Sequence, residues 1–274
     1  MQYQKTLARS ISYTGIGLHS GKDVTITLHP AEEHTGIVFK RVDLPSQPTV
    51  RAVAGNVTNT MRATTLEDGE AKVFTVEHLM AAFHVMGVTN CLVEITSPEP
   101  PVADGSAKLF IGLIEEAGIR EQEAEQAIHV IDKPYTVRDG DKFITVVPYD
   151  GLRVSFTSVN PHPYIGVQYG DYEIEPEEFK REVANARTIA FAHEIEALQK
   201  MGLGLGGSME NVVIYDKEHA LNPLHYPDEL VRHKILDVVG DLALTGGLRG
   251  HVIAVKSSHA LNTQLAKLIV AAKE

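Results

Sequence analysis

The chain has 274 residues, of which 43% are hydrophobic and 22% are charged, and its formal net charge is −11. This balance is typical of a globular protein and excludes a fibrous or wholly disordered chain, and the length allows one large domain or two modest ones. The acidic charge argues against a nucleic-acid-binding protein, because such a protein needs a basic surface to neutralise phosphates. A local basic pocket for a small anion is compatible with it.

The first half of the chain predicts a mixture of strands and helices. Strands are predicted at residues 24–28, 37–39 and 91–95. The polar segment GLHSGK, at residues 17–22, predicts a turn. Helices are predicted at residues 76–86 and 107–117, and Ser106 is the expected N-cap of the second.

The acidic and polar stretch at residues 118–127 predicts a domain boundary. Beyond it, strands are predicted from the segments IHVI, YTVR, FITVVP, RVSFTS, TIAF, VVIYD and HVIAV. Helices are predicted at residues 176–184, 193–201, 228–244 and 258–273. The strands come in runs and do not alternate strictly with helices, which favours an α+β fold over a doubly wound sheet.

The single cysteine, Cys91, lies in the apolar run CLVEI, which is typical of a buried strand. One thiol forms neither an intrachain disulfide nor a multi-cysteine zinc site, so we interpret it as a small buried hydrophobic residue. The first 15 residues hold no apolar stretch like that of a signal peptide, and no run approaches the roughly 18 apolar residues of a membrane span. We expect a cytoplasmic protein without stable membrane insertion.

The predicted helix at 228–244 has a polar stripe on a mostly apolar surface. His233, Asp237 and Asp241 follow one another at intervals of four residues, which places them on one face. An imidazole and a carboxylate spaced in this way can bind one zinc ion. The alternative is an ordinary solvated face, since a chain with 13 histidines produces one such pair easily.

A second element, TVEHLMAAF, begins the predicted helix at 76–86 with the adjacent pair Glu77 and His78. The H-E-x-x-H zinc motif is absent, so the pair is a weak signal by itself. A catalytic zinc needs three protein ligands and an open position for water. His78 with His233 and Asp237 would make three, and Glu77 would then be free to act as a base.

Two further segments have competing interpretations. His259, in KSSHALN, lies where a strand is predicted to end and the last helix to begin. It is therefore either a functional imidazole or a histidine that caps the helix or lies on the surface. The glycine cluster GLGLGG at residues 202–207 is not followed by the Lys-Ser/Thr pair of a phosphate-binding P-loop. We interpret the cluster as a turn between a helix and a strand.

Taken together, the motifs resemble the zinc-dependent UDP-3-O-acyl-N-acetylglucosamine deacetylases of lipid A biosynthesis. Seven segments appear in the order of that family: TGIGLHSGK, TVEHLMAA, PVADGSA, ARTIAF, GLGLGGSMEN, VRHKILDVVGDL and KSSHALN. The resemblance implies an α+β fold of two domains of similar topology, each a β-α-α-β layered sandwich, with the active site between them. We place the domains at residues 1–126 and 127–274. The first contributes Glu77 and His78, and the second contributes an acyl-chain passage and the residues His233, Asp237, Asp241 and His259.

The resemblance also implies a role for individual residues. The zinc ligands would be His78, His233 and Asp237, and Glu77 would be the general base. Iron can also occupy a set of two histidines and an aspartate, because affinity order alone does not decide which metal is loaded.

The remaining roles follow from the same resemblance. His259 would be a general acid or an electrostatic partner of the intermediate, oriented by Asp241, and Thr188 would help to hold the oxyanion. Whether Glu77 or His259 protonates the leaving amine stays open at this point. Lys234 would meet the diphosphate of the nucleotide.

The resemblance also assigns residues to the substrate. Lys142 and His19 would lie near it, and Phe191 with residues 192–215 would line a passage for the acyl chain. The sequence departs from the family at Ile189, where phenylalanine is common, and at Ser258, where glycine is usual. The first departure should alter the preference for acyl-chain length, and the second could shift His259 slightly.

We expect a monomeric deacetylase that acts on UDP-3-O-acyl-N-acetylglucosamine. Two other functions are alternatives. A phosphoesterase would often use two metals and therefore more ligands than the three predicted here. A non-catalytic nucleotide-sugar-binding protein with a structural ion would usually close the site with four ligands, often cysteines. Three ligands beside an unused glutamate favour catalysis.

Overall fold

The computed structural model describes residues 2–272. Its first half contains α1 (Glu77–Met86), α2 (Lys108–Ala117) and a short 3₁₀ turn η1 (Ala54–Asn56). The strands of this half are β1 (Tyr3–Leu7), β2 (Ile11–Ile16), β3 (Asp23–Pro30), β4 (Ile37–Arg41), β5 (Thr49–Arg51), β6 (Val57–Asn59), β7 (Thr65–Asp68), β8 (Ala71–Phe74), β9 (Cys91–Ile95) and β10 (Ile119–Glu125). All the elements predicted here are present, within one to three residues of the expected bounds.

The second half contains α3 (Pro176–Glu182), α4 (Ala192–Lys200), α5 (Glu229–Leu242), the 3₁₀ turn η2 (Ala243–Thr245) and α6 (His259–Ala271). Its strands are β11 (His129–Val130), β12 (Tyr135–Asp139), β13 (Lys142–Val147), β14 (Leu152–Val159), β15 (Val167–Glu173), β16 (Ile189–Phe191), β17 (Val213–Tyr215) and β18 (Leu248–Val255). The predicted helix at 258–273 extends into residue 273, which lies outside the described residues.

The two halves have the same sheet topology. The first has a five-stranded sheet in the order β2-β3-β9-β4-β5, and the second has the order β12-β13-β18-β14-β15, with β11 also paired to β18. In both, the last strand along the chain enters the middle, antiparallel to one neighbour and parallel to the other. This confirms an α+β fold of two similar units, and we propose that the boundary lies between residues 126 and 127.

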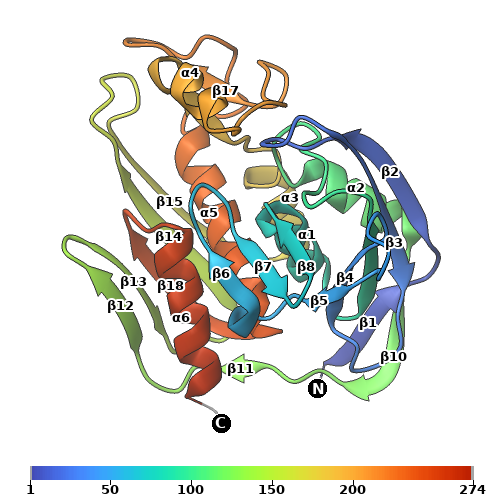
Figure 1. Cartoon of the computed structure of the whole chain (residues 1–274). Helices are drawn as coiled ribbons and strands as arrows, with labels where there is room; N and C mark the ends of the chain where they lie inside the picture. The colour runs from blue at the N-terminus through green and yellow to red at the C-terminus, as the bar shows by residue number, and fades with distance from the viewer. Residues whose placement is uncertain (1, 273–274) are drawn as a thin grey trace.

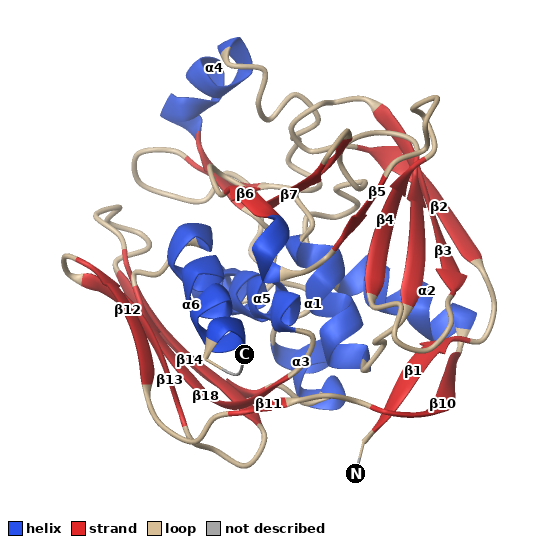
Figure 2. Cartoon of the chain, turned by 60° about the horizontal axis from the view of Figure 1, so that its bottom comes forward, coloured by secondary structure: helices blue, strands red, loops and turns tan. Residues whose placement is uncertain are grey.

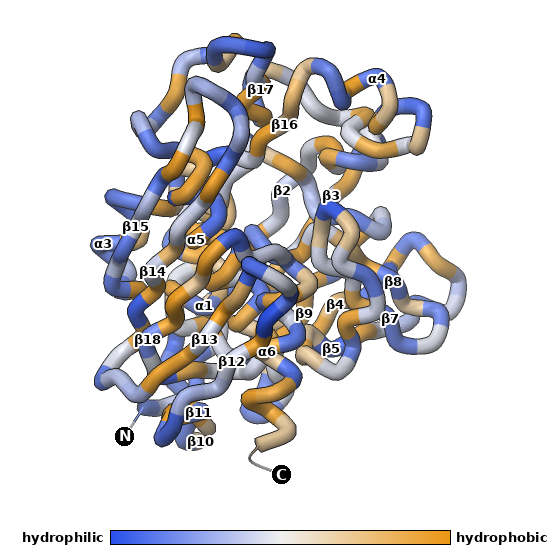
Figure 3. Tube along the Cα trace, turned by 90° about the vertical axis from the view of Figure 1, so that its left-hand side faces the viewer, coloured by the Kyte–Doolittle hydropathy of each residue, from blue (hydrophilic) through white to orange (hydrophobic). Residues whose placement is uncertain are grey.

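Helices fill the space between the two large sheets, so the layers run from sheet to helices to helices to sheet (Figure 2). Hydrophobic residues concentrate in the strands and helices that face one another, and hydrophilic ones in the outer turns (Figure 3). The largest cluster of buried apolar side chains draws on both halves, from Phe83 and Leu79 of α1 to Val238 and Leu242 of α5. The interface between the halves is therefore part of the core.

One local feature was not predicted and one local prediction was wrong. Most of the polar stretch at 118–127 forms β10, a strand that was not predicted, and β10 pairs antiparallel with β1 at the opposite end of the first half. The N-cap position of α2 is Ala107 and not Ser106. The Ser106 hydroxyl still accepts a hydrogen bond, at 3.2 Å, from the N–H of Lys108, the first residue of α2.

The helices α1 and α5 cross closely at Gly240. A side-chain carbon at this position would lie 2.0 Å from the carbonyl oxygen of Glu77, a distance that no real contact permits. Gly240 therefore brings the start of α1, with Glu77 and His78, directly against the face of α5 that carries Asp237 and Asp241.

Replacing Gly240 with alanine should separate the two helices. We expect Gly240→Ala to lower the free energy of unfolding by about 1–3 kcal/mol, the usual cost of overpacking a core. Urea denaturation would measure the change. The matched control is Gly112→Ala, because Gly112 lies in α2 with nothing within 4 Å of the added carbon. The control should be stabilised by about 0.5–1 kcal/mol, and equal behaviour of the two variants would contradict the close crossing.

Candidate active site and metal centre

Three buried side chains from α1 and α5 converge between the two halves. The Oδ1 atom of Asp237 lies 3.3 Å from Nε2 of His233 and 3.7 Å from Nε2 of His78. The two imidazole rings meet edge to face, with centroids 5.0 Å apart. Within residues 2–272 this is the only group of three or more histidine, cysteine, aspartate or glutamate side chains whose ligand atoms lie close enough to hold one metal ion.

The donor set fits a metal ion. Ligands about 2 Å from a tetrahedral ion lie roughly 3.3 Å from one another, which is close to the spacing of these atoms. Asp237 Oδ1 is buried and has no hydrogen-bond partner, so an acceptor is aimed at the gap between the imidazoles. The Nδ1 atom of His233 lies 3.0 Å from the carbonyl oxygen of Ala186 and donates to it. That bond leaves Nε2 unprotonated and free to coordinate.

The charges of this group suit cation binding. Burial lowers the pKa of His233 to about 4, so its imidazole is neutral at neutral pH. Burial would raise the pKa of Asp237, but the histidine and lysine groups beside it hold that pKa well below its usual value. The second oxygen of Asp237 accepts a hydrogen bond from Lys234 Nζ at 3.0 Å. The aspartate is therefore an ionised ligand with one oxygen committed and one free.

Glu77 and His259 face each other beside the metal group. His259 Nε2 lies 3.7 Å from Glu77 Oε1, and His259 Nδ1 donates to Asp241 Oδ2 at 2.8 Å. Burial raises the pKa of Glu77, although His259 and His78 oppose that rise. Burial alone would lower the pKa of His259, but the carboxylates of Asp241, Glu77 and Asp237 outweigh it and raise the pKa to about 10. His259 is therefore an imidazolium at neutral pH, and it lies beside the carboxyl group of Glu77.

The segment that carries Thr188, Ile189 and Phe191 crosses from the second half towards the first. The Thr188 N–H donates to the Gly105 carbonyl at 2.9 Å, and Ile189 and Phe191 pair with β17. Phe191 packs against the ring of Tyr215, with centroids 6.0 Å apart. Together with α4, these strands form a small lobe at one end of the molecule (Figure 1).

A buried ion pair fixes the start of this segment. Arg187 donates to both carboxylate oxygens of Glu229, at 2.9 and 3.2 Å, and to the carbonyl oxygen of Pro223. Because Glu229 is the first residue of α5, the pair ties the segment around Thr188 to the helix that carries the metal group.

His19 is partly buried, whereas Lys142 is exposed. The backbone of His19 is held by the buried carboxylate of Glu99, and its Nδ1 accepts the Gly204 N–H at 3.3 Å. Burial lowers the pKa of His19, Glu99 opposes that effect, and Arg62 and His78 add to it. Lys142 is exposed at the start of β13, where it pairs with Asp139 across the hairpin.

The comparisons with known proteins agree with this geometry. The sequence model of the family described as UDP-3-O-acyl N-acetylglycosamine deacetylase (LpxC) matches residues 4–271. The chain belongs to this family. A protein from Anaeromyxobacter dehalogenans (strain 2CP-C) named UDP-3-O-acyl-N-acetylglucosamine deacetylase is 46% identical over 271 residues, which cover 98% of this chain and 87% of that protein. Proteins of the same name from Citrifermentans bemidjiense (46% over 268 residues, 97% and 88% covered) and Syntrophotalea carbinolica (42% over 274 residues, 99% and 89% covered) are also similar.

Membership of this deacetylase family fits the motifs from which it was predicted, but sequence reasoning missed several site residues. Asp241 has three donors, and only His259 among them was predicted. The Thr64 hydroxyl donates to Oδ1 at 2.5 Å, and the Asn262 amide donates to Oδ2 at 2.9 Å. Asn262 ends the quoted motif KSSHALN, so its polar side chain near a predicted site was an available signal. Thr64 gave no comparable signal.

The glycine cluster of this deacetylase also has a clearer role than a turn. A side-chain carbon at Gly206 would lie 2.2 Å from the Gly17 carbonyl oxygen. The backbone N–H of Gly206 donates to the Leu18 carbonyl at 2.9 Å. The cluster therefore docks against the turn that carries His19. This contact connects the two halves next to the metal group.

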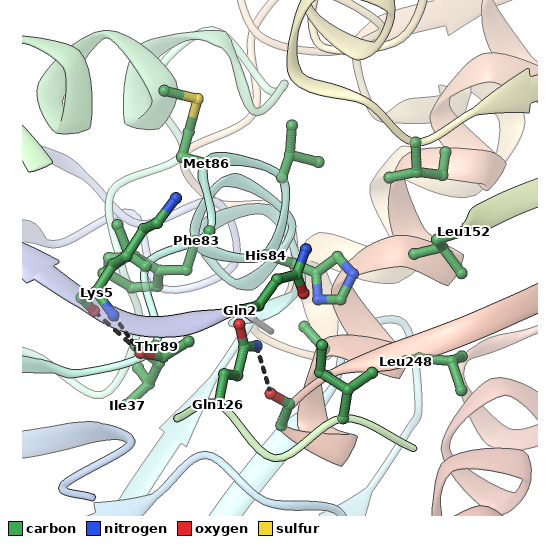
Figure 4. Close-up of a pocket in the computed structure, with 18 of the residues that line it drawn as sticks. Gln2, Lys5, Ile37, Phe83, His84, Met86, Thr89, Gln126, Leu152 and Leu248 are labelled. Carbon is green, nitrogen blue, oxygen red and sulfur yellow. Dashed lines mark hydrogen bonds between the residues drawn. The ribbon is translucent and has the colours of Figure 1, made fainter. Parts of the chain in front are cut away.

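A cavity of about 730 Å³ lies at the other end of α1 (Figure 4). It is lined by Phe83, His84 and Met86 from the last turn of α1, by Gln126 at the end of the first half and by Leu248 from the second half, among others. Seven residues separate Glu77 from His84, a rise of roughly 10 Å along a helix. None of the metal-group residues lines the cavity, so it is distinct from the site described above.

Proposed function

We propose that the protein is a zinc-dependent hydrolase that removes the N-acetyl group from UDP-3-O-acyl-N-acetylglucosamine, in lipid A biosynthesis. The products are acetate and UDP-3-O-acyl-glucosamine. The observation that carries the proposal is the unpaired, buried Oδ1 of Asp237 between two imidazoles, with Glu77 directly beside them, in a chain that belongs to the deacetylase family. The set has three donors, as expected of a catalytic site that keeps one position open.

His78, His233 and Asp237 would hold the zinc ion. When bound, zinc supplies Lewis acidity, which polarises a carbonyl group and makes water acidic enough to lose a proton near neutral pH. The hydrogen bond from His233 to the Ala186 carbonyl fixes the orientation of that ring. The ion pair with Lys234 keeps Asp237 ionised and orients its free oxygen.

Glu77 would act as the general base. Its Oε2 accepts the Thr64 N–H at 3.1 Å, which leaves Oε1 to take a proton from the attacking water. Burial raises the pKa of this carboxylate and makes it a stronger base than an exposed glutamate. The Thr188 hydroxyl would donate to the oxyanion that forms as water adds to the amide carbonyl.

His259 would give a proton to the leaving amine, with Asp241 holding its ring. Because its pKa is raised to about 10, the imidazolium is present at neutral pH and is lost as pH rises through that value. We therefore expect kcat/KM to fall above about pH 10, since the step requires the protonated ring. His259→Gln should be slower and should lack this fall in a pH–rate profile. An alkaline fall unchanged in the variant would assign it to another group.

Phe191 and residues 192–215 would line the passage for the acyl chain, and Lys234, Lys142 and His19 would contact the polar part of the substrate. Ile189 is half-buried and packs on the cluster that includes Tyr215. We expect Ile189→Phe to shift the ratio of kcat/KM between long and short acyl chains by about tenfold, the value of one or two methylenes in a pocket. Substrates of two chain lengths would measure the ratio. Val130→Phe, on exposed β11, is the control, and an unchanged ratio in Ile189→Phe would refute the link.

An assay of products separates this function from the two alternatives. Mass spectrometry of UDP-3-O-acyl-N-acetylglucosamine after incubation should reveal acetate and the free amine. Release of UMP would indicate a phosphoesterase, and tight binding without turnover would indicate a nucleotide-sugar-binding protein.

We further propose that the enzyme works as a monomer in the cytoplasm. No helix within residues 2–272 is both long and apolar enough to cross a membrane. Sedimentation of the purified protein would test the monomer, and fractionation of cells would test the location.

A further inference from the structure

We propose that Thr64 is a positioning residue that holds the base Glu77 and the Asp241–His259 pair in register with each other. The proposal rests on the proposed function, because it takes the roles of Glu77 and His259 from there. Thr64 itself touches neither the metal group nor the segment around Thr188 in any hydrogen bond of the described residues. It acts through the two carboxylates.

Thr64 bridges the two carboxylates with separate groups. Its backbone N–H donates to Glu77 Oε2 at 3.1 Å, and its hydroxyl donates to Asp241 Oδ1 at 2.5 Å. It is 1% exposed, so water does not compete for these bonds. Within residues 2–272, it is the one residue that hydrogen-bonds both carboxylates. Glu77 lies in the first half of the chain and Asp241 in the second, so the bridge also crosses the interface between the halves.

The bridge determines which oxygen of each carboxylate faces His259. On Glu77, Oε2 is occupied and Oε1 faces His259. On Asp241, Oδ1 is occupied by Thr64 and Oδ2 by His259 and Asn262. Both carboxylates are therefore fixed in rotation about their last bond. Since Asp241 is 0% exposed, loss of the Thr64 hydroxyl would leave Oδ1 buried without a donor.

The loop around Thr64 is itself held in place. The Met61 N–H donates to the Asn59 side chain at 2.7 Å, and Arg62 has a left-handed backbone with φ of 66°. The Arg62 guanidinium also pairs with Glu194 of α4 at 3.2 Å. The loop that leads to Thr64 is thus held by contacts with the end of β6 and with α4.

Replacing the hydroxyl with a methyl group tests this role directly. Thr64→Val keeps the shape and the N–H bond to Glu77, and Thr64→Ser keeps the hydroxyl. In the zinc-loaded enzyme we expect Thr64→Val to lower kcat by about 10–100-fold with KM little changed, as a small misplacement of catalytic groups does. Thr64→Ser should recover kcat to within about threefold of the original.

The matched control is Thr245→Val. Thr245 is also buried, and its hydroxyl donates to the Leu242 carbonyl at 2.8 Å, beyond the end of α5. This variant should lose a comparable hydrogen bond and keep kcat within about twofold. A loss of kcat equal in Thr64→Val and Thr245→Val, or a Thr64→Ser variant no better than Thr64→Val, would overturn the proposal.

A spectroscopic readout is independent of turnover. The NMR resonance of the His259 Nδ1 proton can be identified by its absence from His259→Gln. This resonance should shift in Thr64→Val, because Asp241 turns when its bond to the hydroxyl is lost. It should return to its original position in Thr64→Ser, because Asp241 then keeps its orientation. A resonance that does not move in Thr64→Val would overturn the proposal. If the resonance moves but the original protein releases no acetate, the positioning role stands and the proposed function fails.

Discussion

Glu77→Gln is expected to lower kcat for acetate release by about 10²–10⁴-fold, the usual contribution of a general base. Glutamine has the same shape and can still accept the Thr64 N–H, but it cannot take a proton from water. Because Glu77 is not one of the three grouped donors, the bound metal should stay. Steady-state kinetics and metal analysis of one preparation would measure both quantities.

Each of the two readouts for Glu77→Gln can contradict the assignment separately. A variant without metal would make Glu77 a ligand, and a variant with metal and an unchanged kcat would remove it from the chemistry. Glu67→Gln is the control, because this carboxylate lies on β7 near Thr64 but pairs with Lys72 in a partly exposed ion pair. It should keep both the metal and kcat.

Asp237→Ala is expected to empty the metal site and abolish activity. The change removes one of three ligands and leaves Lys234 without its carboxylate. Loss of a residue that only hydrogen-bonds a metal ligand typically lowers metal affinity by about 10–100-fold, and loss of the ligand Asp237 should lower it further. Titration of the metal-free protein with zinc would give the affinity.

The matched control for Asp237→Ala lies on the same stretch of chain. Asp228 precedes α5 and pairs with Arg232 at 2.6 Å. Asp228→Ala should leave zinc affinity unchanged, since this partly buried pair includes none of the three metal ligands. Retention of full zinc affinity in Asp237→Ala would contradict the ligand assignment.

The sequence predicted the helices well because their signals are local. The spacing of His233 and Asp237 placed both on one face of α5, and the structure brings them together with His78. Periodicity alone could not show that α1 lies against α5, because that contact depends on Gly240, far from Glu77 in the sequence. The ordered motifs supplied this pairing through their resemblance to a family.

The parts that could not be predicted depend on contacts between distant residues. The polar run at 118–127 does not alternate apolar and polar residues, so its local sequence did not predict the strand β10 that pairs with β1. Thr64 lies 177 positions from Asp241, and nothing in its immediate sequence distinguishes it from a surface threonine. Lys142 lies exposed on the β12–β13 hairpin, and its contact with the substrate stays a prediction, because no substrate-facing contact within the protein marks it.

The central claim is that one metal ion held by His78, His233 and Asp237 enables deacetylation. The most direct measurement follows metal content and acetate release in the same preparation, first as purified, then after chelation, then after addition of zinc. We predict close to one zinc per chain, acetate release that disappears with the metal, and recovery when zinc is restored. Full acetate release from the metal-free protein would contradict the account.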